Sequence, residues 1–238
     1  MRSPKLLRDR AYALIKQKIV TLEYPIGRQL VEQDICEELG IGRTPVREAL
    51  QRLAAERLIT IIPRRGMFVS QINLWELQRL IETRVMIDVF CARTAAVIRS
   101  QAQVDALRAL FDDAEQKVIE RRIPELLEID RRFHLGIVAI VDNPLISEIA
   151  EKIYDQLMRT WFLSFSRRTT EEIRETVREH MAIVNALEAG QSEAAEREVL
   201  RHLESYRRKV LQQGSRDSGL LQRDLGHEVE LQSIKEAT

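Results

Sequence analysis

Apolar residues recur with the spacing of helices along most of this 238-residue chain, and glycine and proline mark the turns between them. Near the N-terminus, the spacing predicts one helix over residues 7–22 and a second over residues 30–39. A third helix is expected to open at Thr44, whose hydroxyl can cap it, with Pro45 in the first helical position. Its apolar positions share one helical face: Val46, Ala49, Leu50 and Leu53.

Only Ile41-Gly42-Arg43 lies between the second and third helices, and two helices joined by such a tight turn form a helix-turn-helix. In this motif the second helix reads DNA. Arg43, Thr44 and Arg47 lie near the exposed start of that helix, and side chains of these types contact phosphates and base edges. The alternative is an ordinary amphipathic helix whose arginines are solvated.

A predicted β-hairpin follows the third helix. Residues 58–62 are mostly β-branched, residues 67–69 form the returning strand, and the turn over residues 63–66 contains two arginines and ends at Gly66. Glycine at the tip allows the backbone to approach a phosphate closely. Hairpins of this composition are usually only structural, but beside a basic helix this one predicts a winged helix-turn-helix over residues 1–70.

Charge is distributed unevenly, although the net charge is zero. Residues 1–70 contain 13 basic and eight acidic residues, and the rest of the chain is acidic by the same margin. A polyanion such as DNA is therefore expected to meet the N-terminal part. The two cysteines, Cys36 and Cys91, lie far apart, which favours a reducing cytoplasm over a disulfide framework. No apolar run approaches the roughly 20 residues of a membrane span, so no membrane partner is expected.

Residues 71–213 carry only helical patterns and form the second predicted domain. The six expected helices span about residues 74–100, 103–121, 124–142, 144–165, 170–190 and 192–213. Asn143 and Thr169 are suited to cap two of them. Short connections between successive helices favour an antiparallel six-helix bundle, so the predicted fold class is mainly α. Residues 214–238 are polar with little periodicity and are predicted to be a flexible tail.

Three of the four histidines fall within this bundle. Asp130 and His134 are four residues apart and project from the same helical face, and His180 and His202 lie on two later helices. Three imidazoles and a carboxylate suit a divalent transition ion such as zinc. Taken singly, a bundle histidine is more often a hydrogen-bonded polar residue, and a salt bridge with an arginine would account for Asp130.

The N-terminal segments resemble the winged helix of the GntR family of bacterial transcription regulators. The resemblance covers about residues 7–70 and is carried by residues 25–32, 39–50 and 63–69. It implies DNA contacts from the reading helix and from the wing tip, at Arg43, Thr44, Arg47 and Gly66. Two positions depart from the family pattern. Gly42 replaces a common serine or threonine, and Arg57 replaces the glycine that usually ends the reading helix.

The bundle resembles the all-helical effector domain of the FadR-type branch of this family, at the six-helix, VanR-like size. The pattern lies in Asp130-x-x-x-His134, Asn143, Glu179-His180 and His202-Leu203. The resemblance implies a metal held by one aspartate and three histidines: Asp130, His134, His180 and His202. Zinc is the first expectation, with nickel or manganese as alternatives.

The same resemblance implies a small carboxylate effector that completes the coordination of the metal. It places Arg84 toward the effector cavity, and the planar guanidinium of arginine can hold a carboxylate through two hydrogen bonds. The alternative is a salt bridge from Arg84 to Glu82 or Asp88. Asp88 itself departs from the glutamate that is usual in the family.

The combined prediction is a ligand-responsive, DNA-binding transcription regulator, not an enzyme, that binds as a homodimer to an operator with two-fold symmetry. Repression is the usual case in the family, and the effector would act by changing the affinity for DNA. A metal-sensing regulator, in which the ion is the signal, is one alternative. A helical-bundle metalloenzyme is another, but no glutamate is placed as a general base in the manner of His-Glu-x-x-His.

Overall fold

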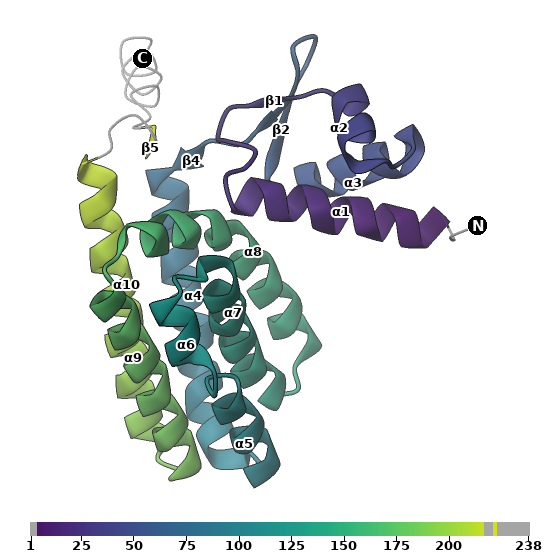
Figure 1. Cartoon of the computed structure of the whole chain (residues 1–238). Coiled ribbons are helices and arrows are strands. Elements are labelled where there is room, and N and C mark those ends of the chain that lie inside the picture. The colour runs from purple at the N-terminus through teal and green to yellow at the C-terminus, as the bar shows by residue number, and fades with distance from the viewer. Residues whose placement is uncertain (1–3, 217–220, 223–238) are drawn as a thin grey trace, which may run out of the picture.

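The N-terminal part of the chain folds into three helices and a small sheet (Figure 1). The computed structural model describes residues 4–216 and 221–222. The helices are α1 (Pro4–Val20), α2 (Glu32–Leu39) and α3 (Arg43–Ala55), and the strands are β1 (Gln29–Leu30), β2 (Ile59–Ile62) and β3 (Gly66–Val69). The sheet is antiparallel with the order β1-β3-β2. The predicted winged helix is confirmed: α2 and α3 form the helix-turn-helix, and β2 and β3 form the wing.

The apolar face predicted for α3 forms the centre of the N-terminal core. Four side chains of this face are completely buried: Val46, Ala49, Leu50 and Leu53. Ile15 and Ile19 of α1 belong to the same cluster, because α1 packs along α3. The opposite side of α3, which carries Arg43 and Arg47, is exposed.

The start of α3 differs from the sequence prediction. Gly42 is the N-cap, the helix begins at Arg43, and Pro45 is the third helical residue. The carbonyl oxygen of Gly42 accepts a helical hydrogen bond from the Val46 amide, so backbone geometry starts the helix without a side-chain cap. The capping role predicted for the Thr44 hydroxyl is therefore wrong, and Thr44 lies exposed in the first turn.

The end of α3 has an unusual backbone conformation. Its C-cap is Glu56, and the next residue, Arg57, has a positive φ of 61°. This is the left-handed region, which glycine enters freely and other residues enter at a steric cost. The glycine that usually ends this helix in the family would therefore fit the conformation, whereas Arg57 is strained.

The second part of the chain is a helical bundle in which α4 packs against most of the other helices (Figure 1). Its helices are α4 (Leu74–Ile98), α5 (Gln101–Ala109), α6 (Ala114–Ile119), α7 (Ile123–Ile140), α8 (Pro144–Arg167), α9 (Thr170–Glu188) and α10 (Ser192–Arg216). Asn143 caps α8 by accepting hydrogen bonds from the amides of Leu145 and Ile146. Thr169 forms a capping box with Glu172 at the start of α9. The mainly α fold and both caps are confirmed.

One predicted helix is divided in two. The stretch 103–121 forms α5 and α6, with a turn over residues 110–113 between them. The ring of Phe111 in this turn contacts the rings of Phe133 and His180, at centroid distances of 5.4 and 5.5 Å. The apolar spacing continues through this turn, so the sequence pattern does not show that the helix is interrupted there. The interruption occurs where Phe111 contacts Phe133 and His180.

A short parallel pair lies where the bundle meets the winged helix. Strand β4 (Ile72–Asn73) pairs with β5 (Leu221–Gln222), so the chain returns to this place after α10. The flexible tail predicted for residues 214–238 begins within α10, and apart from β5 its remainder lies outside the described residues. Among the described helices, none has the length and apolar character that crossing a membrane requires.

Helix α8 connects the bundle to the winged helix. Lys16 of α1 forms a salt bridge with Asp155 of α8, with 2.5 Å between Nζ and Oδ2. Arg131 of α7 approaches the other carboxylate oxygen of Asp155 at 3.4 Å. One turn further along α8, Arg159 donates a hydrogen bond of 2.6 Å to the carbonyl oxygen of Ser70, directly after the wing. These contacts hold the two parts of the chain together.

Replacing Arg57 by glycine is expected to stabilise the protein, because glycine adopts a positive φ without the clash of a Cβ atom. We expect the free energy of unfolding of Arg57→Gly to be about 1 kcal/mol higher than that of Arg57→Ala, which loses the same charge but keeps the Cβ. Urea denaturation followed by circular dichroism measures the difference. Equal stabilities of the two variants would show that this positive φ carries no cost.

Candidate functional site

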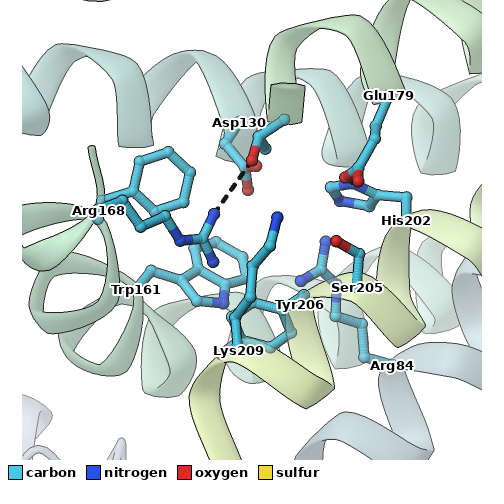
Figure 2. A pocket seen from close by; sticks show the side chains of 11 residues that line it. Arg84, Asp130, Trp161, Arg168, Glu179, His202, Ser205, Tyr206 and Lys209 are labelled. Carbon is cyan, nitrogen blue, oxygen red and sulfur yellow. Dashed lines mark hydrogen bonds and ion pairs between the residues drawn. The ribbon is translucent and has the colours of Figure 1, made fainter. Parts of the chain in front are cut away.

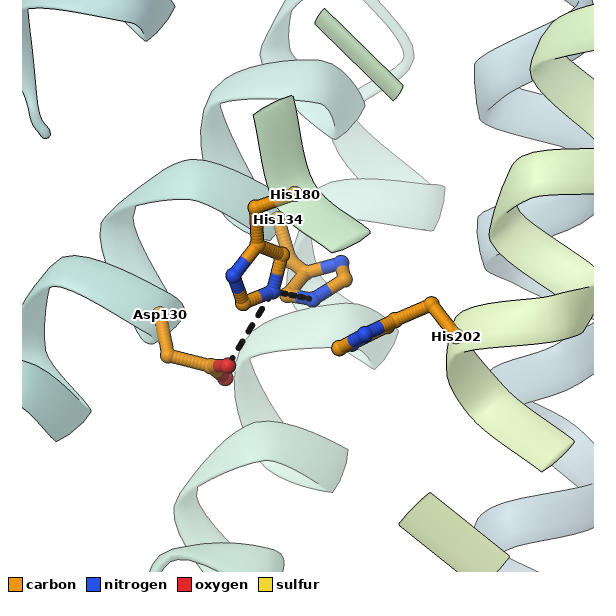
Figure 3. Close-up of side chains that lie close together, drawn as sticks. All are labelled: Asp130, His134, His180 and His202. Atoms are coloured by element: carbon orange, nitrogen blue, oxygen red, sulfur yellow. Dashed lines mark hydrogen bonds and ion pairs between the residues drawn. The ribbon is translucent and has the colours of Figure 1, made fainter. Parts of the chain in front are cut away.

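Three helices of the bundle bring together the aspartate and the three histidines singled out in the sequence (Figure 3). Asp130 and His134 come from α7, His180 from α9 and His202 from α10. The Nε2 atom of His180 lies 3.2 Å from Asp130 Oδ1 and 3.2 Å from His134 Nε2. One nitrogen or oxygen from each residue lies within 4.8 Å of those of the others, and all four residues are buried. This is a compact set of one oxygen and three nitrogen donors.

Two carboxylates outside this cluster orient its imidazoles. Asp88 of α4 places Oδ2 at 3.3 Å from Nδ1 of His134. Glu179 of α9 places Oε2 at 2.9 Å from Nδ1 of His202. A hydrogen on each Nδ1 leaves the Nε2 atoms of both rings unprotonated and able to bind a cation, which is the usual arrangement around metal-binding histidines.

Electrostatics favour the protonation states that a cation requires. Burial lowers the pKa of His134, and the Arg84 guanidinium lowers it further. Burial also holds the pKa of His202 well below its usual value. Burial alone would raise the pKa of Asp130, but its hydrogen bond and charge interaction with His180 bring that pKa well below the usual range. At neutral pH, His134 and His202 are therefore neutral and Asp130 is ionised.

Arg84 lies beside the cluster and is only 2 % exposed. Its Nε atom donates to Asp88 Oδ2 at 3.1 Å, and its Nη2 atom donates to His134 Nε2 at 2.8 Å. Its guanidinium also lies 4.9 Å from the centre of the Tyr154 ring. The sequence left a salt bridge from Arg84 to Glu82 or Asp88 as the alternative, and the structure contains the one to Asp88. Glu82 is exposed and is not the partner of Arg84 in the described part of the chain. Arg84 also lines the cavity that adjoins the cluster.

A narrow, partly open cavity adjoins the cluster (Figure 2). Asp130, His202 and Arg84 form part of its wall. The rest of the wall is formed by residues from α8, α9 and α10 and by the residue that ends α8: Trp161, Phe165, Arg168, Thr176, Glu179, Ser205, Tyr206 and Lys209. The wall thus has three cationic groups, on Arg84, Arg168 and Lys209, beside the carboxylates of Asp130 and Glu179.

Several of these residues are not recognisable from sequence spacing alone. In the sequence, Asp88 stands out only because it lies one turn after Arg84, and Glu179 only because it directly precedes His180. Neither position shows that the carboxylate is the partner of an imidazole. Trp161 and Lys209 have no signal of this kind, because aromatic and basic residues are common on any amphipathic helix. Their place in the cavity depends on how α8 and α10 pack.

The residues predicted to contact DNA lie on the exposed surface of the winged helix. Arg43, Thr44 and Arg47 are exposed at the start of α3, and Gly66 is exposed at the wing tip with a φ of 110°. Glu32 of α2 holds Arg47 through two nitrogens, with 2.9 Å between Nη2 and Oε2, and this hydrogen bonding lowers the pKa of Glu32. Arg47 must exchange this carboxylate for DNA if it contacts an operator.

Two protein-family models match successive parts of the chain. The model described as bacterial regulatory proteins, gntR family, matches residues 7–69. The FCD domain model matches residues 79–205. The first match covers the winged helix, and the second covers the helices that carry the cluster and Arg84.

Similar proteins of known role are transcription regulators. The chain is 27 % identical over 201 residues to the HTH-type transcriptional repressor RspR of Escherichia coli strain K12. The matched region covers 84 % of this chain and 87 % of that protein. It is 24 % identical over 222 residues to the galactonate operon transcriptional repressor of the same strain, and this match covers 85 % of this chain and 96 % of that protein.

A solved structure shares the fold. The structure of E. coli McbR/YncC matches with a TM-score of 0.78 at 20 % sequence identity, over 90 % of this chain and 99 % of that one. A Rhodococcus GntR-type regulator matches with a TM-score of 0.73 at 21 % identity, over 86 % and 97 %. With both family models matched in order along the chain, this protein belongs to the GntR family of bacterial regulatory proteins and is a DNA-binding transcription regulator with an FCD domain.

Proposed function

We propose that this regulator is a repressor whose DNA binding responds to a small carboxylate held by a metal ion in the bundle. The buried cluster of one aspartate and three histidines is the observation that carries this proposal. Two similar proteins are named as repressors, which supports repression over activation. A regulator of bacterial transcription works in the cytoplasm, where the chromosome lies.

The donor set fits a divalent transition ion. One carboxylate oxygen and three imidazole nitrogens are ligands that zinc accepts, and nickel and manganese accept them as well. Asp88 and Glu179 supply the hydrogen bonds that metal-binding imidazoles usually make through their second nitrogen. An ion held by Asp130 and the three histidines would supply a Lewis acid that anchors an effector carboxylate, and no catalysis is proposed.

Arg84 is placed to bind the same carboxylate. Its Nη2 atom donates to His134 Nε2, which is the nitrogen available as a metal ligand. When that nitrogen holds an ion, the N–H of Arg84 needs another acceptor, because a buried donor without a partner is costly. An effector carboxylate beside the cluster supplies this acceptor, while Arg84 Nε keeps its bond to Asp88.

Helix α8 offers a route from the cavity to the DNA-binding part. Trp161 of α8 lines the cavity. Asp155 and Arg159 of the same helix hold Lys16 of α1 and the carbonyl oxygen of Ser70. An effector that displaces α8 would move the winged helix, and it would thereby change the affinity for DNA.

A homodimer would present two reading helices to an operator with two-fold symmetry. Helix α4 leaves Met86, Phe90 and Val97 exposed on one face, at 66, 51 and 67 %. An apolar face of this kind suits association of two identical subunits about a two-fold axis. One α3 helix reaches few base pairs, so a second is needed to specify a site.

Glu179→Gln is expected to weaken zinc binding about 10- to 100-fold, because the amide is a poorer partner for His202 Nδ1 than the carboxylate. Competition with a chromophoric chelator measures the affinity. Glu175→Gln is the matched control, since Glu175 lies one turn earlier on α9 and pairs with Arg178 outside the cluster. Failure of the unmodified protein to take up zinc, nickel or manganese after chelation and reloading would overturn the metal site.

An effector carboxylate should stabilise the metal-loaded protein. An acid present at ~100 times its Kd adds about 2.7 kcal/mol to the free energy of unfolding, and chelation of the metal should remove this gain. Arg84→Lys keeps a cation beside Asp88 but lacks the planar fork, so the acid should bind this variant more weakly. Thermal unfolding with a panel of small carboxylic acids measures both effects.

Two outcomes of this screen would count against the proposal. Equal acid binding by Arg84→Lys and the unmodified protein would contradict the role of Arg84. Operator binding that responds to the metal alone, with no acid changing stability or DNA affinity, would replace the effector site by a metal sensor.

Arg43→Ala should weaken operator binding by about 1–3 kcal/mol if Arg43 reads a base edge. A site is first selected from random duplexes, and affinities are then measured by fluorescence anisotropy at one salt concentration. Arg52→Ala is the matched control, because Arg52 is on the same helix but lies over the Tyr12 ring and pairs with Glu56. Equal losses in the two variants would indicate a general charge effect and not a specific contact.

A further inference from the structure

The winged helix and the bundle meet at a group of charges that water reaches poorly. Asp155 of α8 lies between two cations: its Oδ2 is 2.5 Å from Nζ of Lys16, and its Oδ1 is 3.4 Å from Nη2 of Arg131. These side chains are only 13, 18 and 26 % exposed, in that order. Removing one partner of such a pair leaves the other charge with little water to replace it, so the contact fixes its geometry more strictly than a surface salt bridge does.

Hydrogen bonds continue from this group to the end of the reading helix α3. Nζ of Lys16 donates at 3.0 Å to the hydroxyl of Tyr12, one turn earlier on α1. That hydroxyl donates at 2.7 Å to Oε2 of Glu56, which is the C-cap of α3. Burial raises the pKa of Tyr12, and the bond to Glu56 raises it further, so the hydroxyl keeps the proton that it donates. Successive polar contacts therefore connect α8 to α3 through α1, which lies between them (Figure 1).

Helix α8 also holds the winged helix at a second point. Arg159, one turn after Asp155, donates at 2.6 Å to the carbonyl oxygen of Ser70, directly after β3. The hydroxyl of Ser70 lies 2.9 Å from the hydroxyl of Thr60 in β2, within hydrogen-bonding distance. A single attachment would let the winged helix turn about it. Attachments at α1 and after the wing together fix the direction in which α3 points.

A fixed direction of α3 has a consequence for the DNA that a dimer binds. Half-sites that face the same side of the duplex are about 10–10.5 base pairs apart, or a multiple of this. Inserting one base pair therefore turns one half-site by about 35° relative to the other and shifts it by about 3.4 Å. A rigidly attached pair of reading helices reaches the displaced half-site only if the DNA is deformed. Rigid attachment thus becomes a preference for one spacing.

We propose that Asp155 is a positioning residue for operator recognition and sets the half-site spacing that this regulator accepts. It acts on α3 through Lys16 and Tyr12 and not through contact with DNA. This role goes beyond the effector response, since it operates with no ligand in the bundle. It rests on the proposed homodimer, because a single winged helix has no spacing to select.

The test measures spacing preference separately from half-site recognition. An operator is selected from random duplexes, and its half-sites are then moved together or apart by one and two base pairs. Fluorescence anisotropy at one salt concentration gives the affinity of the full chain for each duplex and for a duplex with a single half-site. We expect the unmodified protein to prefer one spacing by about tenfold or more, because the other duplexes must be deformed. Asp155→Asn should reduce this preference to about threefold or less and leave the affinity for the single half-site unchanged.

Further variants test each step of the connection. Tyr12→Phe keeps the ring but removes the hydroxyl that links Lys16 to α3, so it should broaden the spacing preference as well. Lys16→Met should have the same effect, and adding it to Asp155→Asn should change little, because both substitutions remove the same pair. Glu148→Gln is the matched control: it makes the same change of charge on the exposed side of α8, where Glu148 pairs with Lys152, and should keep the full preference.

The outcomes separate this inference from the homodimer on which it rests. A spacing preference that survives in Asp155→Asn, or that is lost equally in Glu148→Gln, would overturn the inference and leave the homodimer in place. Equal losses of affinity for the operator and for the single half-site in Asp155→Asn would assign this residue to the stability of the winged helix and would overturn the inference too. An unmodified protein that binds no spacing more tightly than the single half-site would overturn the homodimer and the inference together.

Discussion

Burial of charge at the centre of the bundle is the constraint on which the rest of the structure depends. Arg84 is held there by Asp88, and the Tyr154 hydroxyl lies 2.8 Å from both oxygens of Asp88. His134 completes the network from α7. Helices α7 and α8 each supply a hydrogen-bond partner to this ion pair of α4, so displacing either of them leaves a buried polar group without a partner, at a cost of about 1–3 kcal/mol. The same network orients His134, which makes the geometry of the cluster a consequence of the packing of the bundle.

Helix α8 joins the two halves of the protein because its two sides have different tasks. One side carries Tyr154 and Trp161 into the interior, next to Arg84. The other side carries Asp155 and Arg159 toward α1 and the residues after the wing. A small displacement of α8 would therefore be felt both at the buried charges and at the base of the winged helix. This shared element is the physical basis for coupling a ligand in the bundle to DNA at α3.

The sequence by itself determined the features that depend on residues close together in the chain. Apolar spacing predicted the helices, and Asn143 and Thr169 marked the starts of two of them. The tight turn before α3 and the basic hairpin after it predicted the winged helix. A spacing of four residues placed Asp130 and His134 on one face of α7. These predictions succeed because helical periodicity and capping are local interactions.

Only the tertiary structure decided the features that join distant segments. Phe111 contacts Phe133 and His180 at the turn that divides residues 103–121, although the apolar spacing continues through it. Asp88 and Glu179 become imidazole partners because α4 and α9 lie beside α7 and α10. The cavity combines side chains from α4, α7, α8, α9 and α10 and from the residue that ends α8. Pairing of buried charges depends on which helices are in contact, and no spacing along a single helix records that information.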